Sequence, residues 1–364
     1  MAEGCPLKGL VLSGGQGTRL RPFTYCQAKQ LLPVANRPVL FYALEQMAEA
    51  GIDEVGIVVG QTGPQVRQAV GDGSAFGLRV TYIEQEAPLG LAHAVLTARP
   101  FLGDGPFVVF LGDNLVAESI RPHVEAFLER RPACQLLLQS VSDPRSFGVA
   151  VVDGQRVVRV VEKPQEPPSD LAIVGVYMFD GVLWDALSGL RPSWRNELEL
   201  TDAIQRLIDG GQRVEYRLLQ GPWVDVGSLE SILEANRVAL QRLSARNEGV
   251  VDAESLLEGP VVVEAGACVE RSRLTGPLVI GSGAQVRECS LGPFVAIGRD
   301  CRLERVSLQD SVVMDGAVLE RIAWPLEGCL IGRQAAISGP FDDGGRFSLA
   351  LADHSRIRLL DGGP

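Results

Sequence analysis

The chain has 364 residues, of which 46% are hydrophobic and 22% charged, a balance typical of a globular protein. This length exceeds what one compact core usually holds, so we expect two domains. The formal net charge of −11 argues against nucleic acid as a partner, because nucleic-acid-binding proteins present a basic face. No run approaches the roughly 20 apolar residues that span a bilayer, and the first residues lack the layout of a signal peptide. We therefore expect a cytoplasmic protein with no membrane partner.

Seven cysteines are scattered along the chain without a Cys-x-x-Cys spacing, and only three histidines accompany them. Their odd number and irregular spacing predict buried thiols in a reducing compartment, rather than a disulfide framework or a zinc site. The cysteines are Cys5, Cys26, Cys134, Cys268, Cys289, Cys301 and Cys329.

Up to about residue 240, short apolar runs alternate with amphipathic stretches. Helices are predicted over 38–51, where Pro38 suits a first turn and Gly51 a C-cap, and over 89–98. Alternating strands and helices predict a mostly parallel sheet, which binds its ligands at the carboxyl ends of its strands. The apolar runs that predict strands are 9–14, 54–60, 79–85, 106–114 and 133–142.

The pattern changes after residue 146. Residues 147–164 predict a hairpin that turns at Asp153-Gly154. Residues 197–211 then predict a helix, and 213–227 a strand. A long helix is predicted over 228–245, with Ser228 as a candidate N-cap.

The last third of the sequence is a repeat. Five copies begin with an aliphatic residue, and successive copies start 17, 17, 16 and 18 residues apart. A small residue follows four positions after each start. A fixed period of this length predicts a solenoid, in which each turn buries one face against the next. The starting residues are Val263, Ile280, Ile297, Val313 and Ile331, and the small residues are Ala267, Ala284, Cys301, Ala317 and Ala335.

A glycine-rich turn, SGGQGTRLRP, follows the first predicted strand at residues 13–22. It lacks the third glycine of a dinucleotide-binding fingerprint and the Lys-Ser/Thr of a Walker A loop. Its glycines would let backbone N–H groups approach an anion, and Arg19 could bind phosphate oxygens in a bidentate manner. A plain tight turn is the alternative. Lys29, ten residues further on, favours a site for a polyanion.

These motifs together resemble the signature of the sugar-1-phosphate nucleotidyltransferases. The form Lys-Gln-Leu-Leu-Pro at 29–33 is most similar to thymidylyltransferases that act on glucose 1-phosphate. The resemblance covers about residues 8–240, and the repeat is similar to the C-terminal part of long forms that serve deoxysugar pathways. Further matching segments are GLAHA (90–94), LGDN (111–114), FGV (147–149), EKP (162–164), VGVYMFD (174–180), ELELTD (197–202) and WVDVGS (223–228).

The resemblance implies two domains. Residues 1–240 would form a catalytic α/β domain with a Rossmann-like, mostly parallel mixed sheet. Residues 241–364 would form a left-handed parallel β-helix of hexapeptide-type repeats. The resemblance also implies a homo-oligomer.

The implied reaction joins two polyanions, because an oxygen of the sugar phosphate attacks the α-phosphorus of a nucleoside triphosphate and pyrophosphate leaves. Such chemistry depends on positioning and on neutralising charge. By resemblance, Asp113 and Asp225 would hold Mg²⁺, a cation that favours one or two carboxylates. The alternatives are a helix N-cap for Asp113 and a turn residue for Asp225.

The resemblance assigns further residues to the nucleotide, dTTP or UTP. Arg19 and Lys29 would neutralise the triphosphate, and Gln85 would read the pyrimidine edge, since a side-chain amide both donates and accepts. A single methyl group separates thymine from uracil, and it discriminates by only about 1–3 kcal/mol. The other implied nucleotide-binding residues are Gly14, Gly15, Gly17, Thr18, Gln30 and Gly90.

Glucose 1-phosphate would be held by a second group of residues. By resemblance, Lys163 binds its phosphate, Glu162 accepts hydrogen bonds from its hydroxyls, and Arg195 adds a second cation, although a solvated arginine is the alternative. Phe147 stands where short thymidylyltransferases have tyrosine, so an aromatic hydroxyl is missing near the sugar. The other implied residues are Asn114, Gly148 and Val174.

Two competing hypotheses stay open at this stage. One is a non-catalytic regulatory or scaffold subunit, against which the presence of Arg19, Lys29, Asp113, Lys163 and Asp225 argues. The other is an acyltransferase built on the repeat, which usually needs a catalytic histidine. The last histidine, His354, follows the final repeat.

Overall fold

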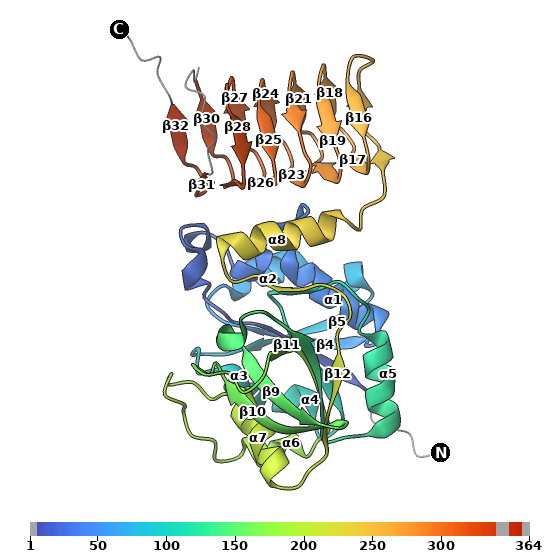
Figure 1. Cartoon of the computed structure of the whole chain (residues 1–364), viewed down its shortest axis with the longest axis vertical. Coiled ribbons are helices and arrows are strands. Elements are labelled where there is room, and N and C mark those ends of the chain that lie inside the picture. The colour runs from blue at the N-terminus through green and yellow to red at the C-terminus, as the bar shows by residue number, and fades with distance from the viewer. Residues whose placement is uncertain (1–5, 340–348, 359–364) are drawn as a thin grey trace. The chain divides into compact units, whose positions relative to one another are not determined.

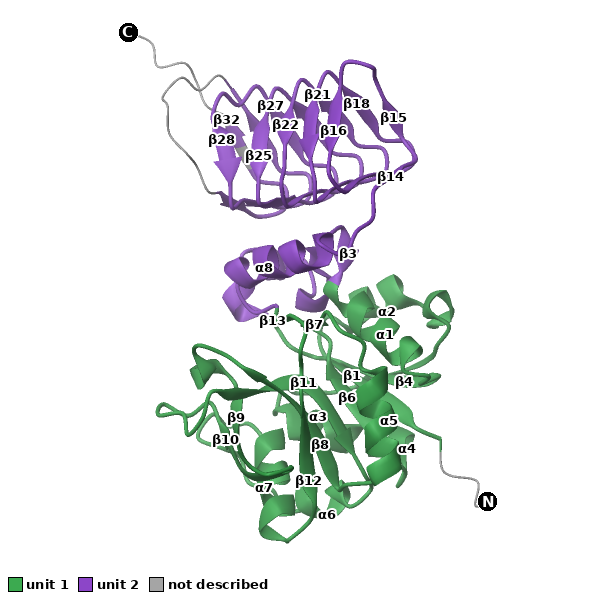
Figure 2. Cartoon of the chain, turned by 45° about the vertical axis from the view of Figure 1, so that its right-hand side comes forward, with its two compact units in different colours: residues 1–16, 39–225 green, residues 17–38, 226–364 purple. Residues whose placement is uncertain are grey.

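The computed structural model describes residues 6–339 and 349–358 (Figure 1). Contacts divide the chain into two compact units, coloured separately in Figure 2. Unit 1 comprises Met1–Gln16 and Val39–Asp225, and unit 2 comprises Gly17–Pro38 and Val226–Pro364. This division differs from a boundary at residue 240, because residues 17–38 and the helix after Asp225 pack with the repeat.

Unit 1 is built on a mixed sheet that has nine strands among the described residues, in the order β5-β4-β1-β6-β11-β8-β12-β10-β9. Four neighbouring strands, β5, β4, β1 and β6, are parallel as expected. The strands are β1 (Lys8–Ser13), β4 (Glu54–Val59), β5 (Arg79–Glu84), β6 (Phe107–Leu111), β8 (Cys134–Ser140), β9 (Gly148–Asp153), β10 (Arg156–Glu162), β11 (Leu171–Phe179) and β12 (Val214–Leu218).

The second half of this sheet is less parallel than predicted. β11 runs antiparallel to both β6 and β8, and β10 runs antiparallel to β9 and β12. The hairpin of β9 and β10 is confirmed, but its turn is Gly154-Gln155, one residue later than expected.

Two predicted strands are each divided. Gly112 and Asp113 separate β6 from β7 (Asn114–Val116), and residues 219–222 separate β12 from β13 (Trp223–Asp225). β7 and β13 pair with each other in a separate two-stranded sheet. The prediction of a single strand over 213–227 was therefore wrong, because Gly221-Pro222 interrupts it.

Helices cover the large sheet. Alternate strand residues such as Leu10, Leu12, Phe107 and Val109 form a core with α3, α6 and α7. α7 is amphipathic and buries Leu200, Ala203, Ile204 and Leu207 at helical spacing. The helices of unit 1 are α1 (Val39–Glu49), α2 (Gly63–Val70), α3 (Leu91–Thr97), α4 (Arg99–Leu102), α5 (Arg121–Arg130), α6 (Leu183–Leu187) and α7 (Leu200–Asp209), with 3-10 turns η4 (Ser74–Phe76) and η5 (Pro144–Ser146).

Unit 2 begins with three 3-10 turns, η1 (Thr18–Leu20), η2 (Phe23–Tyr25) and η3 (Lys29–Leu31), and a short hairpin of β2 (Pro33–Val34) and β3 (Arg37–Pro38). The chain enters unit 2 for a second time at Val226, and the helix α8 (Leu229–Leu240) follows. Ser228 is its N-cap, as predicted: its Oγ accepts from the N–H of Ser231, whose side chain in turn caps Ser228.

After α8 the chain passes in turn through three parallel sheets, so that each strand from β14 to β27 pairs with the strand three places later; β29 and β30 pair with β31 and β32, two places later. The first sheet contains β14 (Arg246–Asn247), β17 (Val261–Val263), β20 (Leu278–Ile280), β23 (Val295–Ile297), β26 (Ser311–Val313), β29 (Leu330–Ile331) and β31 (Ala350–Leu351). The second contains β15 (Val250–Val251), β18 (Cys268–Glu270), β21 (Gln285–Arg287), β24 (Arg302–Glu304), β27 (Val318–Glu320), β30 (Ala336–Ser338) and β32 (Arg356–Arg358). The third contains β16 (Leu256–Glu258), β19 (Arg273–Thr275), β22 (Ser290–Leu291), β25 (Ser307–Gln309) and β28 (Pro325–Glu327).

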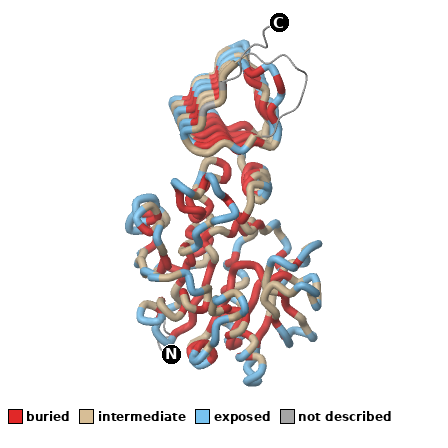
Figure 3. Tube along the Cα trace, turned by 90° about the vertical axis from the view of Figure 1, so that its left-hand side faces the viewer, coloured by how far each residue is buried: buried red, intermediate tan, exposed pale blue. Residues whose placement is uncertain are grey.

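The alignment of the repeat is confirmed by strand register. Val263 pairs with Ile280, Ile280 with Ile297, and Ile297 with Val313. The aliphatic and small positions of the copies are buried in the interior of these coils, which Figure 3 shows in red. Each small residue also accepts, through its carbonyl, an N–H from the preceding coil.

No disulfide joins cysteines within the described part of the chain, and Cys5 lies outside that part. Cys134, Cys289, Cys301 and Cys329 are buried, but Cys26 is exposed and Cys268 only half-buried. Burial raises the thiol pKa of Cys289 to about 11 and of Cys301 to about 12, which disfavours their reactive thiolate form. Every helix in the described ranges is too short or too polar to cross a lipid bilayer.

Candidate active site

Asp113 and Asp225 are 112 positions apart in the chain, yet both accept a hydrogen bond from one side chain. The Nδ2 atom of Asn114 lies 2.9 Å from Oδ1 of Asp113 and 3.4 Å from Oδ1 of Asp225. The antiparallel pairing of β7 with β13 places Asn114 directly opposite Asp225. The two carboxylates therefore face the same amide at the end of β6.

Asn114 is itself fixed in place. It is 1% exposed, and its Oδ1 accepts a hydrogen bond of 2.6 Å from Nε1 of Trp223. A Cβ at Gly175 would lie 2.8 Å from the same oxygen, so this strand position needs glycine. The sequence motif that contains Trp223 was recognised, but its part in the site was not predicted.

Neither alternative for the two aspartates fits the structure. The next helix after Asp113 is α5, and its N-cap residue is Ile120. Asp225 is the last residue of a strand rather than a turn residue. Within residues 6–339 and 349–358, no three His, Cys, Asp or Glu side chains gather as a closed metal site. A pair of carboxylates suits a cation that keeps oxygen ligands from water or phosphate, as Mg²⁺ does.

Tyr177 reports on the electrostatics around these carboxylates. Burial raises the pKa of its phenol strongly, and the negative charges of Glu162, Asp225 and Asp113 raise it further. The phenol of this tyrosine therefore stays neutral in the negative field of these acidic side chains. Glu162 belongs to the same neighbourhood of unit 1 as the two aspartates.

Glu162, at the end of β10, is the centre of a second cluster. Its Oε1 lies 3.5 Å from Nη1 of Arg195 and 3.9 Å from Nζ of Lys163, and its Oε2 accepts a 3.0 Å hydrogen bond from Thr201. The pairing of β9 with β10 sets Gly148 opposite Glu162. Thr201 belongs to the recognised ELELTD segment, although sequence reasoning did not select it.

Arg195 is not a solvated arginine. Its guanidinium also pairs with Glu197 at 3.1 Å and with Glu199 at 3.3 Å. Burial raises the pKa of Glu199 above its ordinary value, and Glu162 adds to the rise, whereas the hydrogen bond from Ser193 opposes it. Three carboxylates thus hold one guanidinium in a fixed position.

Two other implied sugar-site residues have less direct roles. Val174 is fully buried in β11, so only its backbone could reach a ligand. Phe147 packs on Trp223 with ring centroids 5.0 Å apart. Phe147, which stands where short thymidylyltransferases have tyrosine, therefore contacts the same Trp223 side chain that donates a hydrogen bond to Asn114.

Gln85 forms a third group within unit 1. Its Nε2 lies 3.3 Å from the carbonyl of Gly90 and 2.9 Å from Nδ1 of His93, a neighbour that sequence reasoning missed within GLAHA. Gly14 lies beside the same side chain. The amide of Gln85 is thus held beside Gly14 of the glycine-rich turn. Gly15, the following residue of this turn, is exposed.

The remaining predicted residues belong to unit 2. Gly17 has φ 63°, and a Cβ there would lie 2.9 Å from Cβ of Lys29, so glycine is required where Lys29 packs against the turn. Thr18 and Arg19 are exposed, whereas Lys29 is 8% and Gln30 1% exposed. Within the described residues, Oε1 of Gln30 has no hydrogen-bond partner.

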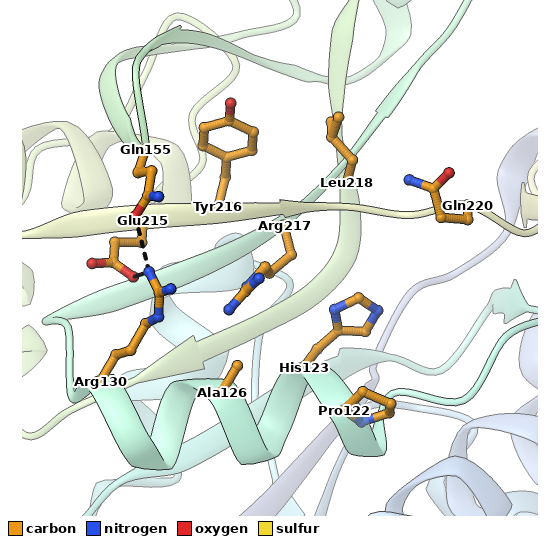
Figure 4. Close-up of a pocket in the computed structure, with 10 residues that line it drawn as sticks. All are labelled: Pro122, His123, Ala126, Arg130, Gln155, Glu215, Tyr216, Arg217, Leu218 and Gln220. Carbon is orange, nitrogen blue, oxygen red and sulfur yellow. Dashed lines mark hydrogen bonds and ion pairs between the residues drawn. The ribbon is translucent and has the colours of Figure 1, made fainter.

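A cavity of about 430 Å³ opens between α5 and β12 (Figure 4). Arg130 crosses it to Glu215 at 3.6 Å and to Gln155 at 3.0 Å. None of the predicted site residues lines this cavity. Its lining residues are Pro122, His123, Ala126, Arg130, Gln155, Glu215, Tyr216, Arg217, Leu218 and Gln220.

Comparison with known proteins gives consistent results. The sequence pattern of the nucleotidyl transferase family matches residues 8–242. The glucose-1-phosphate thymidylyltransferase of Streptomyces antibioticus is 46% identical over 355 residues, and that of Streptomyces griseus is 47% identical over 354 residues. Each alignment covers 97% of this chain and 99% of the relative. A solved structure from Bacillus anthracis, assigned to the same enzyme, is 36% identical with a TM-score of 0.61, covering 64% of this chain and 95% of its own.

Proposed function

The chain belongs to the nucleotidyl transferase family, and we propose that it is a glucose-1-phosphate thymidylyltransferase, which converts dTTP and glucose 1-phosphate into dTDP-glucose and pyrophosphate. The structural observation that carries the proposal is the single amide of Asn114 between Asp113 and Asp225. The similarity to two thymidylyltransferases over 97% of the chain supports the choice of substrates.

Asp113 and Asp225 would hold Mg²⁺. Bound there, the cation would neutralise charge on the reacting phosphates. Asn114 keeps the two carboxylates in place before any ligand arrives, because its amide donates to both. This preorganisation removes part of the cost of assembling the site.

The side chains of unit 2 would bind the triphosphate. Arg19 is exposed and can bind phosphate oxygens in a bidentate manner, and Lys29 adds a second positive charge. Gly14, Gly15, Gly17, Thr18 and Gln30 would complete the phosphate-binding turn. Gln85, fixed by its contacts with Gly90 and His93, would read the pyrimidine.

The cluster around Glu162 would bind glucose 1-phosphate. Lys163 and Arg195 would bind its phosphate, and the Glu162 carboxylate would accept hydrogen bonds from its hydroxyls. Thr201 and Glu199 orient these groups through their contacts with Glu162 and Arg195.

The three parallel sheets of unit 2 are compatible with a left-handed parallel β-helix, and we propose that architecture for residues 241–364. The match of the repeat register with its 16- to 18-residue period supports it. We also propose that the protein acts in the cytoplasm as a homo-oligomer in a pathway that makes deoxysugars.

A pyrophosphate-release assay tests the proposed function. The full chain is incubated with Mg²⁺ and each pairing of dTTP or UTP with glucose, galactose or mannose 1-phosphate. The expected result is fastest release with dTTP and glucose 1-phosphate. Equal rates with UTP would contradict the thymidylyl assignment alone, and no release from any pair would contradict the enzyme proposal.

A further inference from the structure

The hairpin that ends the 17–38 segment has an unusual turn. Ala35 and Asn36 both have left-handed backbone, with φ of 48° and 64°, between β2 and β3. Two-residue hairpins favour this turn, but a residue with a Cβ such as alanine disfavours the conformation. Such backbone persists where its surroundings hold it.

Two asparagine side chains hold this turn, and both connect it to other parts of unit 2. The Oδ1 atom of Asn236, in α8, accepts a 2.9 Å hydrogen bond from the N–H of Ala35, and its Nδ2 donates to the carbonyl of Phe294 at 3.3 Å. Asn36 donates through Nδ2 to the carbonyl of Ile297 at 2.6 Å. Phe294 and Ile297 belong to the repeat coils.

Asn236 is 0% exposed, so the amide cannot exchange these partners for water. Replacing it would leave buried backbone groups without partners, which is costly. The turn of the hairpin is therefore tied to the coils in two ways, directly through Asn36 and indirectly through the side chain of Asn236 in α8.

The same segment carries the side chains assigned to the triphosphate. η3, which contains Lys29 and Gln30, packs against β3, and Lys29 packs against Gly17. Because Lys29 lies only a few residues before the hairpin turn, a displacement of this turn would also move Lys29. Small displacements of substrate-binding groups have large effects on turnover.

We propose that Asn236 and Asn36 are positioning residues through which the repeat coils fix the nucleotide-binding segment, so that the coils set the affinity for the nucleoside triphosphate. This inference rests on the proposed function of Arg19 and Lys29. It gives the repeat a part in substrate binding in addition to any part in assembly.

Two variants of the full chain separate the contacts. Asn36→Gly keeps a residue that tolerates φ 64° and removes the hydrogen bond to Ile297. Asn236→Asp keeps the acceptor for Ala35 and removes the donor to Phe294. Arg237→Gln is the matched control, because Arg237 occupies the next position in α8 and pairs with Asp310 of the coils.

Steady-state kinetics with dTTP and glucose 1-phosphate gives the main readout. We expect the KM for dTTP to rise at least about five-fold in Asn36→Gly and Asn236→Asp, with less than about a two-fold change in the KM for glucose 1-phosphate. Hydrogen exchange of the amides of residues 29–36 should accelerate in both variants. Arg237→Gln should leave both KM values and this exchange unchanged.

The outcomes distinguish this inference from the function on which it rests. An active wild type with unchanged KM values in both asparagine variants would overturn the inference alone. Equal rises in both KM values, or the same effect in Arg237→Gln, would assign the asparagines a merely structural role. A wild type that releases no pyrophosphate would overturn the function and the inference together.

Discussion

At the scale of single residues, Asn114 contributes most to the organisation of the site. It contacts Asp113, Asp225 and Trp223, and Gly175 leaves it the space it needs. An aspartate at this position would place a third negative charge beside two carboxylates. An amide instead neutralises part of their mutual repulsion without adding charge.

Removing one carboxylate charge should stop turnover. We expect Asp113→Asn to lower kcat by at least about 100-fold, because charge stabilisation at reacting phosphates contributes several kcal/mol. Circular dichroism should show an unchanged fold. Asp143→Asn is the control, since Asp143 pairs with Arg145 on the surface of unit 1. Full activity of Asp113→Asn would mean that the cation is held elsewhere.

The raised pKa of Glu199 predicts a pH-dependent stability. Because burial raises this pKa above its ordinary value of 4.5, ionised Glu199 destabilises the fold as pH rises through and above that value. Glu199→Gln should therefore melt at a higher temperature than wild type at about pH 8, and the difference should shrink toward about pH 4. Melting curves across this range check the sign, and a difference independent of pH would contradict it.

Much of the candidate site could be selected from sequence because its residues lie in short motifs that resemble those of the family. Asp113, Asp225, Glu162 and Lys163 were selected by this resemblance. Thr201 and His93 were missed, although both lie inside recognised segments, because their importance depends on contacts with residues distant in sequence.

At the scale of elements, hydrophobic patterns and cap residues identified α8, the β9–β10 hairpin and the repeat. The antiparallel direction of β11 could not be predicted, because its apolar run would look the same in either direction. The division of residues 213–227 was signalled by Gly221-Pro222, since proline lacks the N–H that a continuing strand requires.

The capping box of α8 predicts a measurable loss of stability. Ser228→Ala removes the acceptor for the N–H of Ser231 and should cost about 1 kcal/mol in the free energy of unfolding. Ser228→Asp retains an acceptor and should cost much less. Urea denaturation compares the two, and equal losses would show that the cap does not stabilise this helix.

At the scale of the whole molecule, the two units have separate hydrophobic cores. Leu303 lies in the core of the coils and Val109 in that of unit 1, each at most 1% exposed. Separate cores predict separate unfolding events, because cooperativity follows shared buried contacts.

Calorimetry can test this expectation. We expect two transitions in the wild type. Leu303→Ala should lower the midpoint temperature of one transition and Val109→Ala that of the other. Each substitution should reduce the free energy of unfolding of its unit by about 2–4 kcal/mol. One transition that both variants shift equally would mean that the units unfold together.

The chain crosses between its two units after Gln16, Pro38 and Asp225. A chimaera that joins two relatives at residue 240 would therefore combine the α8 of one parent with the coils of the other. The partners of Asn236 and Arg237 would then come from different genes. A junction after Asp225 keeps these pairs together, but residues 17–38 must come from the same parent as the coils. We therefore expect functional recombinants in this family to inherit residues 17–38 and the segment after Asp225 from the same parent.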